Sequence, residues 1–97
     1  MQTYVIIRRH GWRTAAQLQE AAERSVRVGE DMAGEVRWIR SYVLDEGEGR
    51  AGTVCIYQAS SPAAIHAHAG RAGLPVDEIV PVADTVVVRP DPQLAAA

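Results

Sequence analysis

Residues 35–59, EVRWIRSYVLDEGEGRAGTVCIYQA, decide the fold because they have the pattern of two strands joined by a turn. The first run carries Trp38, Arg40 and Tyr42 at alternate positions, between mostly aliphatic neighbours. Successive side chains of a strand point to opposite faces of its sheet. The pattern therefore predicts one aliphatic face that forms the core. The other face is aromatic and partly polar, and we expect another surface or a ligand to cover it.

The second run of this stretch alternates in the same way. It sets Thr53, Cys55 and Tyr57 against Val54 and Ile56. Residues 45–52, between the two runs, contain three glycines and four charged side chains, which is typical of a solvated hairpin loop. We expect the two runs to pair as antiparallel neighbours.

The segment before this hairpin predicts a strand followed by a helix. Residues 3–9 are rich in β-branched side chains, and we expect the strand to end at His10-Gly11. Thr14 and Gln17 have the spacing of a capping box, and small or apolar residues recur every three to four positions up to about Met32. The sequence therefore predicts an amphipathic helix over residues 14–32.

The segment after the hairpin predicts a second helix and a last strand. Ser61 before Pro62 is a helix-start signal, and Gly73 before Pro75 is a helix-stop signal. A further β-type region covers residues 80–89, and its continuity past Asp84 stays open.

The element order is strand, helix, strand, strand, helix, strand, which predicts an α+β, ferredoxin-like split βαβ sandwich. We expect a four- to five-stranded antiparallel sheet with two helices on one face. Residues 1–89 form a single domain in this interpretation, and residues 90–97 form a flexible C-terminal tail. Because two helices cover only one face of the sheet, we expect a homodimer through the open face.

Composition narrows the class of protein. Hydrophobic residues make up 47% of the chain and charged residues 23%, as in an ordinary globular domain. The net charge of −2 comes from interleaved basic and acidic residues, so nucleic acid is not an expected partner. No apolar run is long enough for a membrane span, and Cys55, the single cysteine, fits a reducing cytoplasm. We expect a cytoplasmic protein without membrane contact.

Three histidines are candidate metal ligands. His66 and His68 are two positions apart on the predicted second helix, about 200° around its axis, so they do not chelate one ion together. His68 borders the apolar stripe and His66 is expected to point to solvent. His10 follows Arg8 and Arg9, a cationic neighbourhood that disfavours a divalent metal.

The hairpin supplies candidates for binding a cofactor or ligand, namely Arg40, Tyr42, Cys55 and Tyr57. A cysteine central in a strand is usually an apolar filler, whereas a tyrosine offers a rigid ring with a polar tip. Arg40 can stack on the neighbouring rings, pair with a carboxylate across a dimer, or bind an anion. No Gly-rich phosphate loop, HExxH, CxxC or GxSxG motif occurs, so whether the protein is an enzyme stays open.

Four segments taken together resemble one small bacterial family. They are YVI at 4–6, RWIRSYV at 37–43, CIYQA at 55–59 and HAHAGRAGLP at 66–75. Their order and spacing resemble the ferredoxin-like domains of unknown function whose members are described as nickel-binding, over most of residues 3–83. Ile7 and Arg9 stand about where relatives usually carry acidic residues.

The resemblance implies a homodimeric ferredoxin-like fold and a site for Ni²⁺ or another divalent transition metal. His68, Tyr42 and Cys55 occupy positions that match the family pattern. Our first functional hypothesis is therefore a small, non-catalytic, nickel-binding homodimer with imidazole ligands.

The alternative comes from the dimeric α+β-barrel enzymes and binding proteins, which share this architecture. It places a small-molecule pocket between sheet and helices. In that pocket His68 would act as acid or base and Tyr42 would position the ligand.

Overall fold

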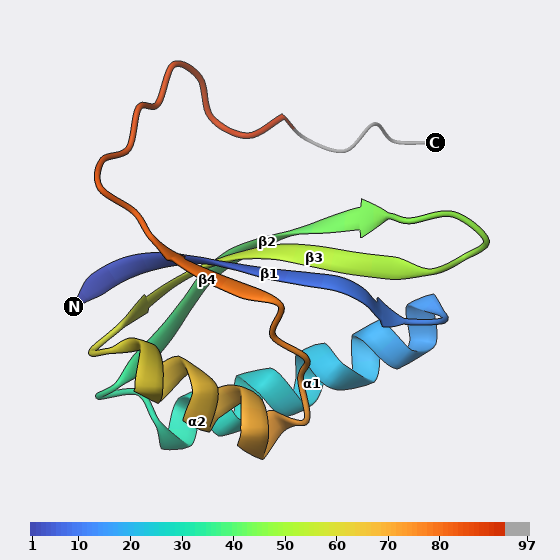
Figure 1. Cartoon of the computed structure of the whole chain (residues 1–97), viewed down its shortest axis with the longest axis horizontal. Helices are drawn as coiled ribbons and strands as arrows, with labels where there is room; N and C mark the ends of the chain where they lie inside the picture. Colours follow the sequence, from blue (N-terminus) through green and yellow to red (C-terminus); the bar gives the residue numbers. More distant parts are fainter. Residues whose placement is uncertain (93–97) are drawn as a thin grey trace.

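The computed structural model describes residues 1–92 as one antiparallel sheet with two helices. The elements along the chain are β1 (Gln2–Trp12), α1 (Ala15–Asp31), β2 (Val36–Asp45), β3 (Ala51–Ala59), α2 (Pro62–Ala72) and β4 (Glu78–Pro81). The strands lie in the order β2-β3-β1-β4, and both helices pack on the same side of the sheet (Figure 1). The predicted ferredoxin-like α+β fold is confirmed.

Local signals begin and end the two helices where the sequence predicts. Thr14 caps α1, because its hydroxyl accepts a hydrogen bond from the backbone N–H of Gln17 at 3.2 Å. Ser61 caps α2 in the same way through Ala64, and Pro62 occupies the first turn. Gly73 ends α2 in the left-handed conformation, with φ of 69°. In residues 1–92 neither helix is both long and apolar enough to cross a membrane.

The C-terminal strand is shorter than predicted, and the sheet has four strands, within the predicted four to five. Antiparallel pairing of β4 with β1 sets Ile7 opposite Glu78 and Tyr4 opposite Pro81. One more hydrogen bond joins the Val82 N–H to the Thr3 carbonyl at 2.9 Å. Beyond that point β1 has almost no residues left to pair with, so the predicted strand does not continue through residues 83–89.

A bulge in β2 overturns the predicted division of the sheet faces. The register of β2 against β3 shifts between Trp38 and Arg40, and one extra residue at this point exchanges the faces. Trp38 lies on the helix side, where its ring stacks on Tyr57 with centroids 6.2 Å apart. Tyr42 lies on the open face. The aromatic side chains of the hairpin therefore do not share one face.

The core lies between the sheet and the helices, and it contains residues that we had expected on the open face. Tyr57, Cys55 and Thr53 of β3 are buried beneath the helices, while Val54 and Ile56 are half-buried on the open side. The apolar core cluster contains Tyr4, Ile6, Met32, Val36, Cys55, Tyr57, Ala59, Ala64 and Ile65. The alternation of β3 was recognised correctly, but its two faces were assigned in reverse.

After β4 the chain leaves the sheet on the side away from the helices and turns back above it (Figure 1). Asp91 fixes this segment to the open face of β2. Its carboxylate accepts hydrogen bonds from the Arg40 guanidinium at 2.7 Å and from the Tyr42 hydroxyl at 2.8 Å. The predicted tail begins at residue 90, and its part at residues 93–97 lies outside the described residues.

Candidate functional site

A pocket of about 510 Å³ lies between α1 and the helix-facing side of the sheet. Its walls are mostly apolar, and its aromatic members are Trp12, Trp38 and Tyr57. The other lining residues are Arg8, Ala15, Leu18, Gln19, Ala21, Ala22, Ser25, Ile39, Arg40, Ser41, Val43, Thr53, Cys55 and Leu74. This volume is typical of sites for small organic molecules, which occupy roughly 300–1,000 Å³.

Arg8 is the most unusual residue of the pocket, because its side chain follows Tyr4 and Ile6 on the buried face of β1. The residue is only 1% exposed. Its Nη1 donates a hydrogen bond to the Pro75 carbonyl at 2.7 Å, and its Nη2 has no partner within residues 1–92. A buried charge without full pairing is costly, which makes this guanidinium unusual among the residues that line the pocket.

A row of hydrogen bonds crosses the pocket wall from β2 to β3. The indole N–H of Trp38 donates to the Ser41 hydroxyl at 2.7 Å, and that hydroxyl bonds the Cys55 thiol at 3.0 Å. Thr53 bonds the same sulfur at 3.3 Å. Both partners of the Cys55 sulfur are hydroxyls, and neither is a base that could accept a proton from a nucleophilic cysteine.

His68 lies in the core and does not line the pocket. Its Nε2 lies 3.1 Å from the Ser25 carbonyl, which fixes the neutral tautomer that carries the proton on Nε2. Burial lowers the pKa of His68, and the charges of Arg8 and Arg71 lower it further. Its ring also packs edge-on against Tyr57, with centroids 5.6 Å apart. These contacts hold the buried His68 ring between Ser25 and Tyr57, with Nε2 occupied by the Ser25 carbonyl.

Tyr57 connects His68 to the pocket wall. Its hydroxyl is 3.2 Å from the Ser25 hydroxyl, and burial raises its pKa, while the hydrogen bond with Ser25 partly offsets this shift. Tyr42, the other tyrosine of the hairpin, lies on the opposite face of the sheet with Asp91. The pocket expected between sheet and helices is therefore present, but neither His68 nor Tyr42 lines it.

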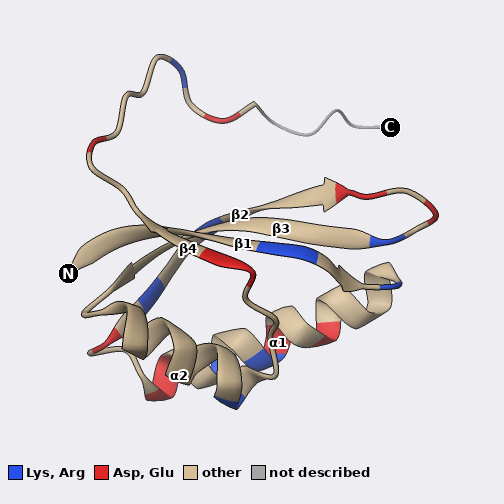
Figure 2. Cartoon of the chain, viewed as in Figure 1, with Lys and Arg blue, Asp and Glu red and all other residues tan. Residues whose placement is uncertain are grey.

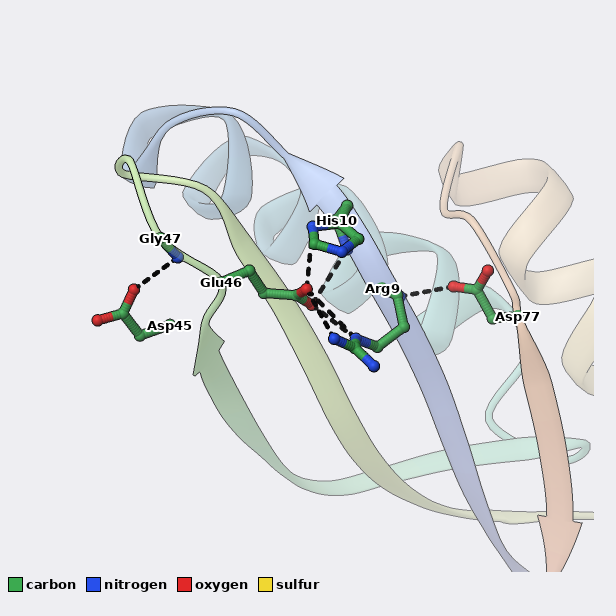
Figure 3. A network of polar contacts seen from close by, with 6 residues as sticks. All are labelled: Arg9, His10, Asp45, Glu46, Gly47 and Asp77. Carbon is green, nitrogen blue, oxygen red and sulfur yellow. Dashed lines mark hydrogen bonds and ion pairs between the residues drawn. The ribbon is translucent and has the colours of Figure 1, made fainter.

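His10 belongs to a second polar cluster, at the end of β1 (Figure 3). Its Nδ1 lies 2.9 Å from a carboxylate oxygen of Glu46, and its backbone N–H donates to the same carboxylate. The Arg9 guanidinium also binds Glu46, at 3.0 Å, and the Arg9 backbone N–H donates to Asp77. The pKa of Glu46 is lowered, chiefly by the hydrogen bond from Arg9.

This cluster changes the electrostatic setting that the sequence suggested for His10. Arg8 points to the other face of the sheet, and the charge of Arg9 is balanced by two carboxylates, those of Glu46 and Asp77. His10 itself is strained, with φ of 50°, and 56% of its side chain is exposed. Strain of this kind is often retained at functional positions.

The three histidines do not converge. His66 is exposed on α2, His68 is buried on the same helix, and His10 lies at the end of β1. Within residues 1–92 no group of three or more His, Cys, Asp or Glu side chains is arranged to hold a metal ion. Figure 2 shows acidic and basic residues interleaved over the helices and the sheet, in agreement with the charge pattern of the sequence.

The sequence analysis did not single out Arg8 or Glu46 as candidate site residues. A signal for Arg8 was present, because the alternation that buries Tyr4 and Ile6 also buries Arg8. Glu46 carried no local signal, since its partners Arg9 and His10 are more than thirty residues away along the chain.

The comparisons with known proteins agree with the fold. A family model described as "Nickel responsive protein SCO4226-like" matches residues 4–82. The crystal structure of SCO4226 from Streptomyces coelicolor A3(2) is similar, with a TM-score of 0.69 and 24% sequence identity. The similarity covers 87% of this chain and 99% of that one. None of the curated proteins matches the sequence.

Proposed function

This chain belongs to the SCO4226-like family of nickel responsive proteins, and we propose that it is a non-catalytic homodimer that binds nickel. The observation that carries the proposal is the pairing of His10 with Glu46. A metal-binding histidine generally donates its other ring N–H to a carboxylate, which fixes the ring and raises the basicity of the ligating nitrogen. His10 has this arrangement at Nδ1, at 2.9 Å from Glu46.

The second ring nitrogen of His10, Nε2, is the proposed nickel ligand. Imidazole suits nickel, and more than half of the His10 side chain is exposed. The Glu46 side chain, in contrast, is only 2% exposed and is held by Arg9. His10 is therefore an exposed imidazole whose ring is held in place by a buried carboxylate. His66 is also exposed, but the described ion pairs give it no carboxylate partner.

One imidazole is a weak nickel site, so the proposal requires ligands from a second copy. The open sheet face supports a homodimer, because Val5, Ile7 and Ile56 are only half-buried there. A hollow of about 1060 Å³ separates this face from residues 82–91, and Val87, which lines it, is 74% exposed. A second copy of the chain that packs here would cover apolar side chains both of the open sheet face and of residues 82–91. Stable interfaces typically bury about 800 Å² per partner.

Calorimetric titration with Ni²⁺ tests the proposal. The wild-type protein should release heat on binding, and His10→Ala should abolish that heat. His66→Ala is the matched control, because it also removes one exposed imidazole but leaves the His10–Glu46 pair intact. Loss of binding in His66→Ala with retention in His10→Ala would refute the assignment. Light scattering on the same samples measures whether the protein is dimeric.

A further inference from the structure

We infer that the pocket between α1 and the sheet binds a small organic carboxylate with a flat apolar body, and that Arg8 holds its carboxylate group. This inference does not depend on nickel binding, since His10 and Glu46 are not among the residues that line the pocket. It assigns a role to the buried arginine that the proposed function leaves unexplained.

The charge of the pocket selects an anion. Its lining includes Arg8 and part of Arg40, whose guanidinium lies on the open face of the sheet, and none of its lining residues in the described part of the chain is Asp or Glu. Arg40 already has a carboxylate partner in Asp91, at 2.7 Å. Within residues 1–92, Arg8 donates to the neutral Pro75 carbonyl and lies near the uncharged Tyr57 phenol, and neither carries a counter-charge. A ligand carboxylate would therefore supply the counter-charge that the protein does not give to Arg8.

The geometry of the guanidinium favours a carboxylate over other acceptors. Nη1 of Arg8 is engaged and Nη2 is unpartnered, although the whole residue is 1% exposed. The planar fork of arginine matches the two oxygens of a carboxylate, and charge-assisted hydrogen bonds are about twice as strong as neutral ones. Thr53 also lines the pocket, and its hydroxyl accepts from the Cys55 thiol, so its own proton is free for one of the remaining lone pairs.

The apolar side chains that line the pocket favour a ligand with a flat, apolar ring system. Trp38 is already stacked on Tyr57, with an interplanar angle of 11°, and it remains 38% exposed. Ile39 and Val43 line the same pocket and are 49% and 60% exposed. An aromatic ring bound against these side chains would bury apolar surface that is now in water, and ring pairs prefer such offset stacking.

A matched pair of probes tests the inference. The compounds 2-naphthoate and 2-naphthamide have nearly the same shape and differ in charge. Trp12 and Trp38 are the two tryptophans of the chain and both line the pocket, so intrinsic fluorescence reports binding. We expect 2-naphthoate to bind the wild-type protein roughly 10- to 100-fold more tightly than 2-naphthamide.

Three variants test whether the preference for 2-naphthoate over 2-naphthamide depends on Arg8 and on this pocket. Arg8→Met keeps the long stem without the charge and should remove the preference for 2-naphthoate. Arg37→Met, at an exposed arginine of β2 outside the pocket, should keep it. Leu18→Trp should fill the pocket and weaken both compounds.

Three outcomes would overturn the inference. They are equal affinity of the wild-type protein for the two compounds, no binding of either compound, and a preference that survives in Arg8→Met. If Arg8→Met does not fold, the wild-type preference for 2-naphthoate and the weaker binding of both compounds to Leu18→Trp still decide the question. Retention of the preference in His10→Ala would separate this pocket from the proposed nickel ligand.

Discussion

Replacing Gly52 by alanine should destabilise the protein and disable the proposed nickel ligand at the same time. A Cβ at this position would stand 2.5 Å from the Arg8 carbonyl oxygen and closer still to the carboxylate of Glu46. The Arg8 carbonyl belongs to paired backbone of β1, opposite Thr53, so it cannot move freely. Glu46 must then leave its place beneath His10.

The size of the effect follows from two contributions. Overpacking against fixed backbone costs about 1–3 kcal/mol. Loss of the ion pair between Arg9 and Glu46 adds little to this cost, because the Arg9 side chain is 57% exposed and water screens its charge. We therefore expect Gly52→Ala to lower the free energy of unfolding by about 1–3 kcal/mol, a substantial part of the roughly 5–15 kcal/mol typical of a domain.

Urea denaturation at pH 7 measures this change, with the Ni²⁺ titration as a second assay. Gly70→Ala is the matched control, because no atom lies within 4 Å of its added Cβ and Gly70 is an exposed residue within α2. That control should gain about 0.5–1 kcal/mol from helix propensity. Unchanged stability and unchanged nickel heat in Gly52→Ala would refute the role of Glu46 as the support of His10.

Three further predictions concern the core, the second helix and the open face. Because the pKa of His68 is lowered in the folded state, its unfolded form binds a proton more readily, so the free energy of unfolding should fall as the pH drops below about 6.5. His68→Gln should flatten this pH dependence in urea titrations between pH 7.5 and 5, and an unchanged slope would contradict it. Ser61→Ala should cost about 1 kcal/mol by removing the α2 cap, measured by thermal unfolding, and a loss below about 0.3 kcal/mol would argue against the cap. Val87→Asp should convert the proposed dimer to monomers in light scattering, and an unchanged mass would place the interface elsewhere.

Sequence signals specified the helices and the element order well, because those signals are local. The capping residues Thr14 and Ser61 and the stop at Gly73 act on backbone groups within one or two turns. The order of strands and helices then left the ferredoxin-like arrangement as the natural way to cover one sheet face with two helices.

The faces of the sheet could not be read from alternation alone. The bulge between Trp38 and Arg40 adds one residue to β2 and moves Tyr42 to the opposite face from Trp38. The residue types near the bulge do not predict it, because Ile39, the extra residue, is common in regular strands. The predicted extent of the last strand was wrong for a different reason. Residues 86–88 have high β-propensity, but β1 ends before they can pair with it.

The candidate site was the least predictable part, because its contacts join residues far apart in the sequence. Tyr42, Cys55 and His68, which the resemblance singles out as candidates, lie in three different environments. The pairs that matter most in the structure connect His10 with Glu46 and Arg8 with Pro75. Both depend on the register of the strands and on where the loops cross, which residue types alone do not reveal.

The most direct test of nickel binding is a crystal soaked in Ni²⁺ and measured at the nickel absorption edge. Our account predicts an anomalous peak at bonding distance from Nε2 of His10, with Glu46 still bound to Nδ1 and the remaining ligands supplied in part by a second copy. A soaked crystal with no peak at His10, or with its peaks only at His66 or His68, would contradict it.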